Sequence, residues 1–181
     1  MRRVIGILIL LAAVHTASAV SGPDGLIPLP VEYSVSDGIY TLRCDGSDVR
    51  TYVGDKAFAE LTADLPDFAR QEAYKIVIGK KGVKVYANTD EGAFRASQTL
   101  RMLRLLDDDV QHCTIFDYPR FQHRGIMLDE SSSFKGKEFV KKQIDAMARY
   151  KFDRLHLQLT DAAGWRIEIK QYPRLTDFAA W

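Results

Sequence analysis

Acidic and polar residues end two apolar runs in the second half of this 181-residue sequence, and they are its best candidates for chemistry. The run Arg124–Asp129 ends in an acid that Glu130 follows, and the run Leu155–Asp161 ends in Thr-Asp. Side chains at the carboxyl ends of parallel strands meet at the edge where α/β barrels and open sheets build their sites. A strand-ending Asp can instead cap the next helix. Two consecutive strands that end this way favour a site.

The two adjacent acids do not form a working pair in an extended strand. Consecutive side chains of a strand point to opposite faces, so Asp129 and Glu130 are a poor candidate for a cooperating carboxylate pair. In the second run, strict alternation places His156, Gln158 and Thr160 on one face and the leucines on the other. A lone His in such a position is more often a hydrogen-bonded structural residue than a catalyst. Trp165, in the loop that follows, either stacks on a sugar or anchors the loop.

A helix must connect the two runs. Lys137–Lys151 is predicted to be helical, with Val140, Ile144, Met147 and Ala148 on one apolar stripe. Strand, helix and strand together form a βαβ unit, which implies parallel strands and a right-handed crossover.

The preceding residues, 31–112, predict a compact α+β unit. Two alternating runs, 74–78 and 83–87, flank a Gly-bounded turn and indicate a hairpin. Thr89 is the expected N-cap of a helix over 92–106. Its apolar face is expected to hold Phe94, Leu100, Leu103 and Leu106, with Arg95, Arg101 and Arg104 on other faces. The triplet Asp107-Asp108-Asp109 then ends the helix, with no metal expected there, and Asp117–Arg120 is a linker.

Composition and charge exclude several classes of protein. Lys+Arg 25 against Asp+Glu 24 gives a net charge of +1, so no basic excess exists to bind nucleic acid. Arg2 and Arg3, the apolar stretch 4–14 and Ala17-Ser18-Ala19 indicate a signal peptide over 1–19. The apolar stretch is too short to span a bilayer of ~30 Å as a helix. We therefore expect an exported protein without stable membrane insertion, in a periplasmic, extracellular or lysosomal-type compartment. Export permits a Cys44–Cys113 disulfide, but the sequence leaves the pairing open.

Several segments of the sequence carry a family resemblance. The run from Pro119 to Asp129, PRFQHRGIMLD, resembles the opening of the catalytic barrel of family 20 glycoside hydrolases, the β-N-acetylhexosaminidases. Leu155–Asp161 followed by Gly-Trp-Arg at 164–166 is similar to that family's second-strand motif, H-x-H-L-T-D-x-x-G-W-R, and Tyr172–Thr176 continues the match. Earlier segments (27–30, 72–74, 92–95 and 98–100) are similar to the family's small α+β domain.

The resemblance implies a fold and an activity. It divides the chain into a signal peptide (1–19), an α+β domain (20–118) and the beginning of a (β/α)₈ TIM barrel (119–181), truncated after about two strands. The implied activity is that of an exo-β-N-acetylhexosaminidase, which hydrolyses terminal N-acetylhexosamine from glycans by substrate-assisted retaining catalysis. No cofactor and no metal are implied. Asp161 aligns with a residue that supports the catalytic acid, and His156 helps shape the substrate pocket.

Two departures from the family pattern matter. Ser132 stands where the family has an Arg that binds hydroxyls of the terminal sugar, and Gln158 stands in place of a second His. The family's Asp-Glu dyad lies in a Gly-Gly-Asp-Glu-like motif that does not occur in this sequence. The chain is therefore interpreted as a fragment, a truncated gene product or a trimmed chain, inactive alone. The alternative is an exported, non-catalytic carbohydrate-binding or interaction module derived from a truncated hexosaminidase gene.

Overall fold

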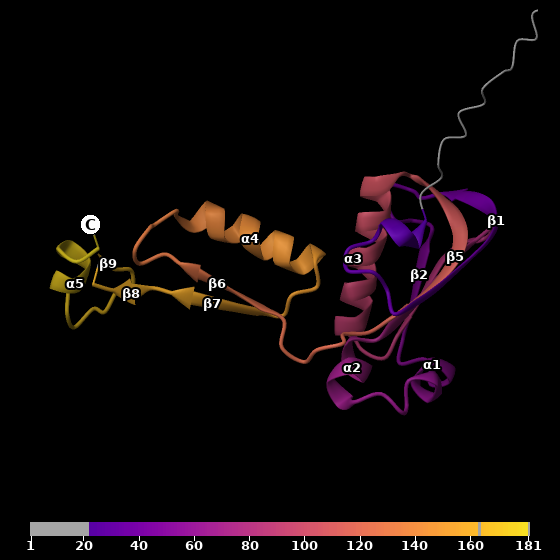
Figure 1. Ribbon diagram of the computed structural model, residues 1–181, viewed down its shortest axis with the longest axis horizontal. Helices are drawn as coiled ribbons and strands as arrows, with labels where there is room; N and C mark the ends of the chain where they lie inside the picture. The colour runs from indigo at the N-terminus through magenta and orange to yellow at the C-terminus, as the bar shows by residue number, and fades with distance from the viewer. Residues whose placement is uncertain (1–21, 163, 181) are drawn as a thin grey trace, which may run out of the picture.

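The computed structural model describes residues 22–162 and 164–180. An α+β unit comes first, and a smaller unit built around two strands and a helix follows it along the chain (Figure 1). The expected signal peptide, residues 1–19, lies outside the described residues. Within them, no helix combines the length and the apolar character needed to cross a bilayer.

The first unit is built on one five-stranded sheet. Its strands lie in the order β1-β5-β3-β4-β2; the β2–β4 pair is parallel and the other pairs are antiparallel. The elements of this unit are η1 (Pro23–Gly25), β1 (Glu32–Thr41), β2 (Val49–Val53), α1 (Lys56–Leu61), α2 (Asp67–Glu72), β3 (Tyr74–Gly79), β4 (Gly82–Ala87), α3 (Asp90–Leu106) and β5 (Asp109–Asp117).

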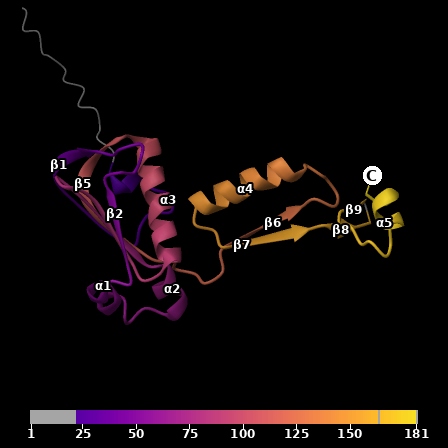
Figure 2. The ribbon, with the colours of Figure 1, turned by 180° about the vertical axis from the view of Figure 1, so that it is seen from behind.

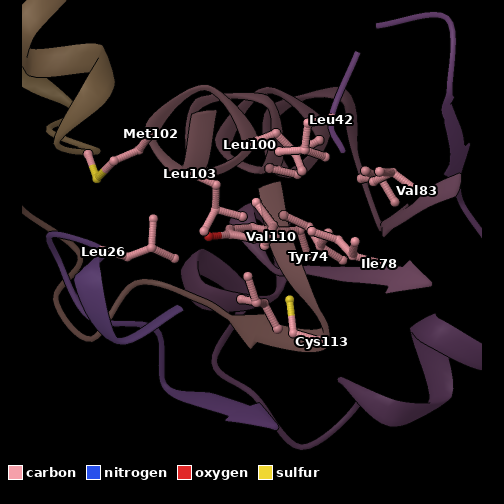
Figure 3. Close-up of a cluster of buried hydrophobic side chains, with 14 of the residues drawn as sticks. Leu26, Leu42, Tyr74, Ile78, Val83, Leu100, Met102, Leu103, Val110 and Cys113 are labelled. Atoms are coloured by element: carbon pink, nitrogen blue, oxygen red, sulfur yellow. The ribbon is translucent and has the colours of Figure 1, made fainter. Parts of the chain in front are cut away.

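Alternation along β3 and β4 creates the core. Ile76 and Ile78 of β3 and Val83 and Val85 of β4 are buried on one face, while the intervening residues are more exposed. The predicted hairpin is confirmed, with Gly79 paired to Gly82 at the turn. Helix α3 covers the apolar face, and Figure 3 shows its side chains meeting those of the sheet. Strand β2 pairs with β4 in parallel and forms one edge of the sheet; this strand was not predicted from the sequence.

Helix α3 has the predicted N-cap, and Leu100 and Leu103 are buried as predicted, but its first turns bury a different face and Leu106 is 46% exposed. Thr89 caps it, because the Thr89 hydroxyl accepts the Gly92 N–H at 3.3 Å. Arg95, expected on an outer face, is only 6% exposed, whereas Phe94, expected in the core, is 46% exposed. That part of the prediction is wrong. The reason is Glu72, at the end of α2, whose carboxylate forms an ion pair with the Arg95 guanidinium and so offsets the cost of removing that charge from water.

The second unit contains the expected strand-helix-strand arrangement. Strand β6 (Gly125–Asp129) and strand β7 (Arg154–Gln158) are parallel, and α4 (Lys137–Arg149) connects them. Figures 1 and 2 show α4 lying along one face of the strand pair. Strand β7 ends earlier than predicted. Thr160–Asp161 forms β8, which pairs with β9 (Gly164–Trp165), and α5 (Arg174–Asp177) follows.

One face of the β6–β7 pair is open. In the parallel register Met127 lies beside His156, so the two side chains share a face, and both are exposed. Met127 is 59% exposed on this face. Parallel strands are normally covered on both faces. This unit is therefore less completely packed than the first.

A set of buried charged side chains joins the two units, and we call Glu72, Arg95, Arg124, Lys151 and Asp117 the junction network. One oxygen of the Glu72 carboxylate, Oε2, accepts hydrogen bonds from Arg95 Nε at 2.7 Å and Arg124 Nη2 at 2.6 Å. Arg124 Nε also donates to the Lys151 carbonyl at 2.8 Å. Residues far apart in the sequence therefore fix the start of β6 to the α+β unit.

Lys151 forms the second half of the junction network. Its Nζ donates to Asp117 Oδ2 and to the Tyr74 hydroxyl, both at 2.7 Å, and that hydroxyl donates to Asp117 at 2.8 Å. Burial lowers the pKa of Lys151, and nearby Asp117 opposes this effect. Burial also raises the pKa of Tyr74 well above its ordinary value, and Asp117 adds to that rise. Asp117, expected in a linker, instead ends β5 as a buried anchor.

The two cysteines do not pair. Cys44 is exposed and Cys113 is buried in the sheet, and both are free thiols. Burial raises the pKa of the Cys113 thiol to about 11. A thiol in that state is a poor nucleophile, so Cys113 acts as a packing residue.

Candidate functional site

The carboxyl ends of β6 and β7 meet through backbone hydrogen bonds. The Glu130 and Ser131 N–H groups donate to the Gln158 carbonyl at 3.0 and 3.2 Å. The Gln158 side chain in turn donates to the Thr160 carbonyl at 2.8 Å. The polar residues that end the two strands therefore lie at one edge, which is the location the sequence predicted for them.

Asp129 is held by the two serines that follow it. One carboxylate oxygen accepts the Ser131 N–H at 3.0 Å, the Ser131 hydroxyl at 2.7 Å and the Ser132 N–H at 3.1 Å. The Ser132 hydroxyl donates to the other oxygen. The hydrogen bond from the Ser132 hydroxyl, followed by that from Ser131, holds the pKa of Asp129 well below its usual range. Asp129 is therefore a fixed anion at the edge of the site.

Glu130 points into a different environment. Its side chain is 2% exposed, and Oε2 accepts the Lys135 N–H at 2.8 Å, just before α4 begins. Asp129 and Glu130 thus serve separate partners, as their adjacency in an extended chain requires. They are not a catalytic carboxylate pair.

Arg166 holds the loop after β6 in place. Its Nε donates to the Glu130 carbonyl at 3.1 Å and its Nη2 to the Ser131 carbonyl at 3.0 Å, and Nη1 reaches the Ala180 carbonyl. Gly164 lies so close that an added Cβ would be 2.8 Å from the Ser131 carbonyl oxygen. Sequence reasoning noted this Gly-Trp-Arg run as a motif but gave Arg166 no role. The sequence feature that could have indicated this role is an Arg that follows Gly-Trp shortly after the end of a predicted strand.

The other predicted site residues lie near this edge without direct contact to Asp129. His156 lies on the open face of β7, in register with Met127. Asp161 is exposed, and its Oδ1 accepts the Ala162 N–H at 2.7 Å. The Trp165 indole donates to the Ile167 carbonyl at 2.6 Å, which suits a loop anchor. Roles in catalysis or binding for Ser132, His156 and Asp161 stay predictions.

The chemistry available at this edge is that of hydrogen-bonding and anionic groups. The carboxylates of Asp129 and Asp161 supply acceptors that suit a polyhydroxylated ligand, while the Ser131 and Ser132 hydroxyls already donate hydrogen bonds to Asp129. Among residues 22–162 and 164–180, no group of three or more His, Cys, Asp or Glu side chains is placed to hold a metal ion.

Comparison with known families gives two matches in succession. Residues 30–118 match the model described as "Glycosyl hydrolase family 20, domain 2", and residues 121–181 match "Glycosyl hydrolase family 20, catalytic domain". These two stretches coincide with the first and second units of the structure.

Curated relatives agree with the two family matches. A β-hexosaminidase of Vibrio furnissii is 45% identical over 112 residues, covering 60% of this chain and 18% of that protein. An N,N′-diacetylchitobiase of Vibrio harveyi is 38% identical over 183 residues, covering 86% of this chain and 20% of that protein. The chain therefore spans about a fifth of the length of these relatives.

Solved structures agree as well. An exo-β-N-acetylglucosaminidase from Vibrio harveyi superposes with a TM-score of 0.70 at 28% identity, over 90% of this chain and 29% of that one. The N-acetyl-β-hexosaminidase of Streptomyces plicatus gives 0.67 at 31% identity, over 86% of this chain and 38% of that one. The α+β unit and the following βαβ unit therefore occur together in known hexosaminidases.

Proposed function

The chain belongs to glycosyl hydrolase family 20, and from this premise we propose that it forms the α+β domain and the first part of the catalytic domain of an exo-β-N-acetylhexosaminidase. The single observation that carries the proposal is the unbroken succession of two domains of one family along the two structural units. The substrate would be a glycan that ends in N-acetylhexosamine. We also propose export, on the basis of residues 1–19.

The proposed reaction is substrate-assisted. The 2-acetamido oxygen of the bound sugar attacks the anomeric carbon, an Asp orients that group, and a Glu protonates the leaving oxygen. Those two acids would come from a motif that this sequence does not contain. The chain would contribute the wall of the pocket at the ends of β6 and β7. We assign Asp161 a supporting role toward the acid, and His156 a role in shaping the pocket.

The junction network supplies rigidity to that wall. Glu72 and Asp117 of the α+β unit hold Arg124 and Lys151, which flank β6 and β7 in sequence. Arg166 then fixes the loop at the opposite end of β6. A pocket wall tied at both ends keeps binding groups in place without an entropic cost at each turnover.

A chimeric enzyme tests the proposal. Residues 30–181 of this chain would replace the corresponding part of the Vibrio harveyi diacetylchitobiase, to which the chain is 38% identical. We expect release of 4-nitrophenol from its N-acetyl-β-glucosaminide at least ~100-fold faster than from its β-glucoside, because only the former carries the internal nucleophile. A folded chimera that cleaves neither compound, or both equally, would contradict the proposal.

Ser132 favours a second candidate, a non-catalytic carbohydrate-binding module, because a short neutral side chain replaces the family's sugar-binding Arg. The Ser132 hydroxyl also donates a hydrogen bond to the Asp129 carboxylate. In the chimera, Ser132→Arg should lower KM if this position faces the sugar, since charge-assisted hydrogen bonds are about twice as strong as neutral ones. A folded, inactive chimera that still binds N-acetylglucosamine oligosaccharides would instead favour the module.

A further inference from the structure

The outer face of the five-stranded sheet carries a group of basic and aromatic side chains. In the parallel register of β2 and β4, Arg50 lies beside Lys84 and Tyr52 lies beside Tyr86. Alternation places all four on the face opposite the buried Val83 and Val85. Two exposed turn lysines adjoin them. We call this group the basic sheet face; its members are Arg50, Tyr52, Lys80, Lys81, Lys84 and Tyr86.

Charge is strongly segregated in the α+β unit. Residues 30–118 contain fifteen acidic and eleven basic side chains. The stretch 73–89 nevertheless contains no acid and four lysines, three of which (Lys80, Lys81 and Lys84) belong to the basic sheet face. The ion pairs formed among the described residues include none of the four cations of the basic sheet face. Asp48, which precedes β2, accepts the Arg43 N–H at 3.3 Å. The face therefore has uncompensated positive charge.

The aromatic pair gives this surface a second property. The Tyr52 and Tyr86 rings stack with centroids 5.1 Å apart and planes 16° apart, and Tyr52 is 39% exposed. Stacked rings hold each other upright on the sheet and present apolar surface and hydroxyls together. Such surface suits the C–H faces of a sugar ring. The neighbouring Arg50 fork and Lys84 ammonium suit carboxylate or sulfate groups.

The basic sheet face looks away from the candidate site. Helix α3 packs on the other side of the sheet and lies between the sheet and the β6–α4–β7 unit (Figures 1 and 2). A ligand on this face would leave the ends of β6 and β7 open. A polymer could therefore be held on one side of the enzyme while its free end is processed elsewhere.

We propose that the basic sheet face binds acidic polysaccharide, a polymer of N-acetylhexosamine and carboxylated or sulfated sugars. The choice of a glycan rests on the proposed function, and the anionic character rests on the uncompensated charge of Arg50, Lys80, Lys81 and Lys84. The net charge of the whole chain is only +1, without the basic excess typical of nucleic-acid-binding proteins, and the stacked Tyr52–Tyr86 pair presents apolar surface that suits sugar rings. Both features favour a glycan over nucleic acid as the polyanion.

A binding measurement on the full chain tests this proposal, with chondroitin sulfate oligosaccharides as the probe. We compare the wild type with a variant of the face, Arg50→Thr/Lys80→Ser/Lys81→Ser/Lys84→Thr, where Thr keeps strand propensity. A control variant, Arg101→Ser/Lys137→Ser/Lys141→Ser/Lys142→Ser, removes the same charge from exposed positions on α3 and α4. Unfolding curves verify that both variants are folded.

We expect the face variant to bind at least roughly fivefold more weakly, from four lost surface ion pairs, and the control to change less than about twofold. Raising the salt concentration should weaken the wild-type complex. Equal weakening by both variants, absence of binding by the wild type, or equal affinity for DNA of matched length would overturn the proposal. Hydrolysis by the chimera is a separate readout. Loss of that activity with binding intact would overturn the proposed function alone.

Discussion

A preparation of this chain alone should release no measurable 4-nitrophenol from 4-nitrophenyl N-acetyl-β-glucosaminide. The sequence has no Gly-Gly-Asp-Glu-like motif, so it supplies neither the general acid nor the acetamido-orienting Asp of the proposed mechanism. General acid–base catalysis contributes typically ~10²–10⁴-fold, and the orienting group adds to this. The measurement is a continuous absorbance assay at high protein concentration.

The chimera that carries residues 30–181 is the positive control for this assay. A mock purification from the same host measures contaminating host hexosaminidase. Turnover by the chain that exceeds the mock preparation and scales with chain concentration would show that its own residues include a working acid. Asp129 and Asp161 would then be the first residues to replace.

The second large effect is expected at the junction network. Glu72→Ala should lower the free energy of unfolding by about 3–5 kcal/mol, because removing one partner leaves the others as uncompensated buried charges. The side chains of Glu72, Arg95 and Arg124 are only 9%, 7% and 16% exposed, so water cannot replace the carboxylate well. Urea unfolding followed by circular dichroism measures the loss.

Asp67→Ala provides the matched control for that variant. Asp67 lies on the same helix, α2, and pairs with Arg70 in an exposed i,i+3 ion pair, with the two side chains 83% and 44% exposed. Exposed pairs contribute about 0–1 kcal/mol, so this variant should unfold near the wild-type midpoint. If Glu72→Ala and Asp67→Ala shift unfolding equally, the junction network does not hold the chain together as described.

Local sequence patterns predicted the elements whose stability is local. The β3–β4 hairpin followed from alternation and its glycine-bounded turn, and the β6–α4–β7 unit followed from two apolar runs separated by an amphipathic helix. Strand β1 could not be predicted, because most of its residues are exposed and a register shift between Val35 and Ile39 interrupts its pairing. Its partner β5 lies far along the chain.

The location of the candidate site could be predicted from the sequence, but the hydrogen bonds within it could not. Strand ends indicated the edge where Asp129 lies, yet no pattern showed that Ser131 and Ser132 would hold its carboxylate. Burial of Arg95 depends on Glu72, which is 23 residues earlier. Contacts of this kind depend on tertiary structure, which outweighs the helix-face pattern read from residues 92–106.

Amide hydrogen exchange on the monomeric chain most directly tests whether residues 121–181 belong to a larger catalytic domain or form a finished module. Strand β3 is hydrogen-bonded on both sides, by β4 and β5, whereas β7 pairs, among the residues that the structure describes, only with β6 and has an exposed face. We predict that the β7 amides of Leu155 and Leu157 exchange at least ~100-fold faster than those of Ile76 and Ile78 in β3. Equal protection of β3 and β7 would contradict membership in a larger barrel and favour a self-sufficient module.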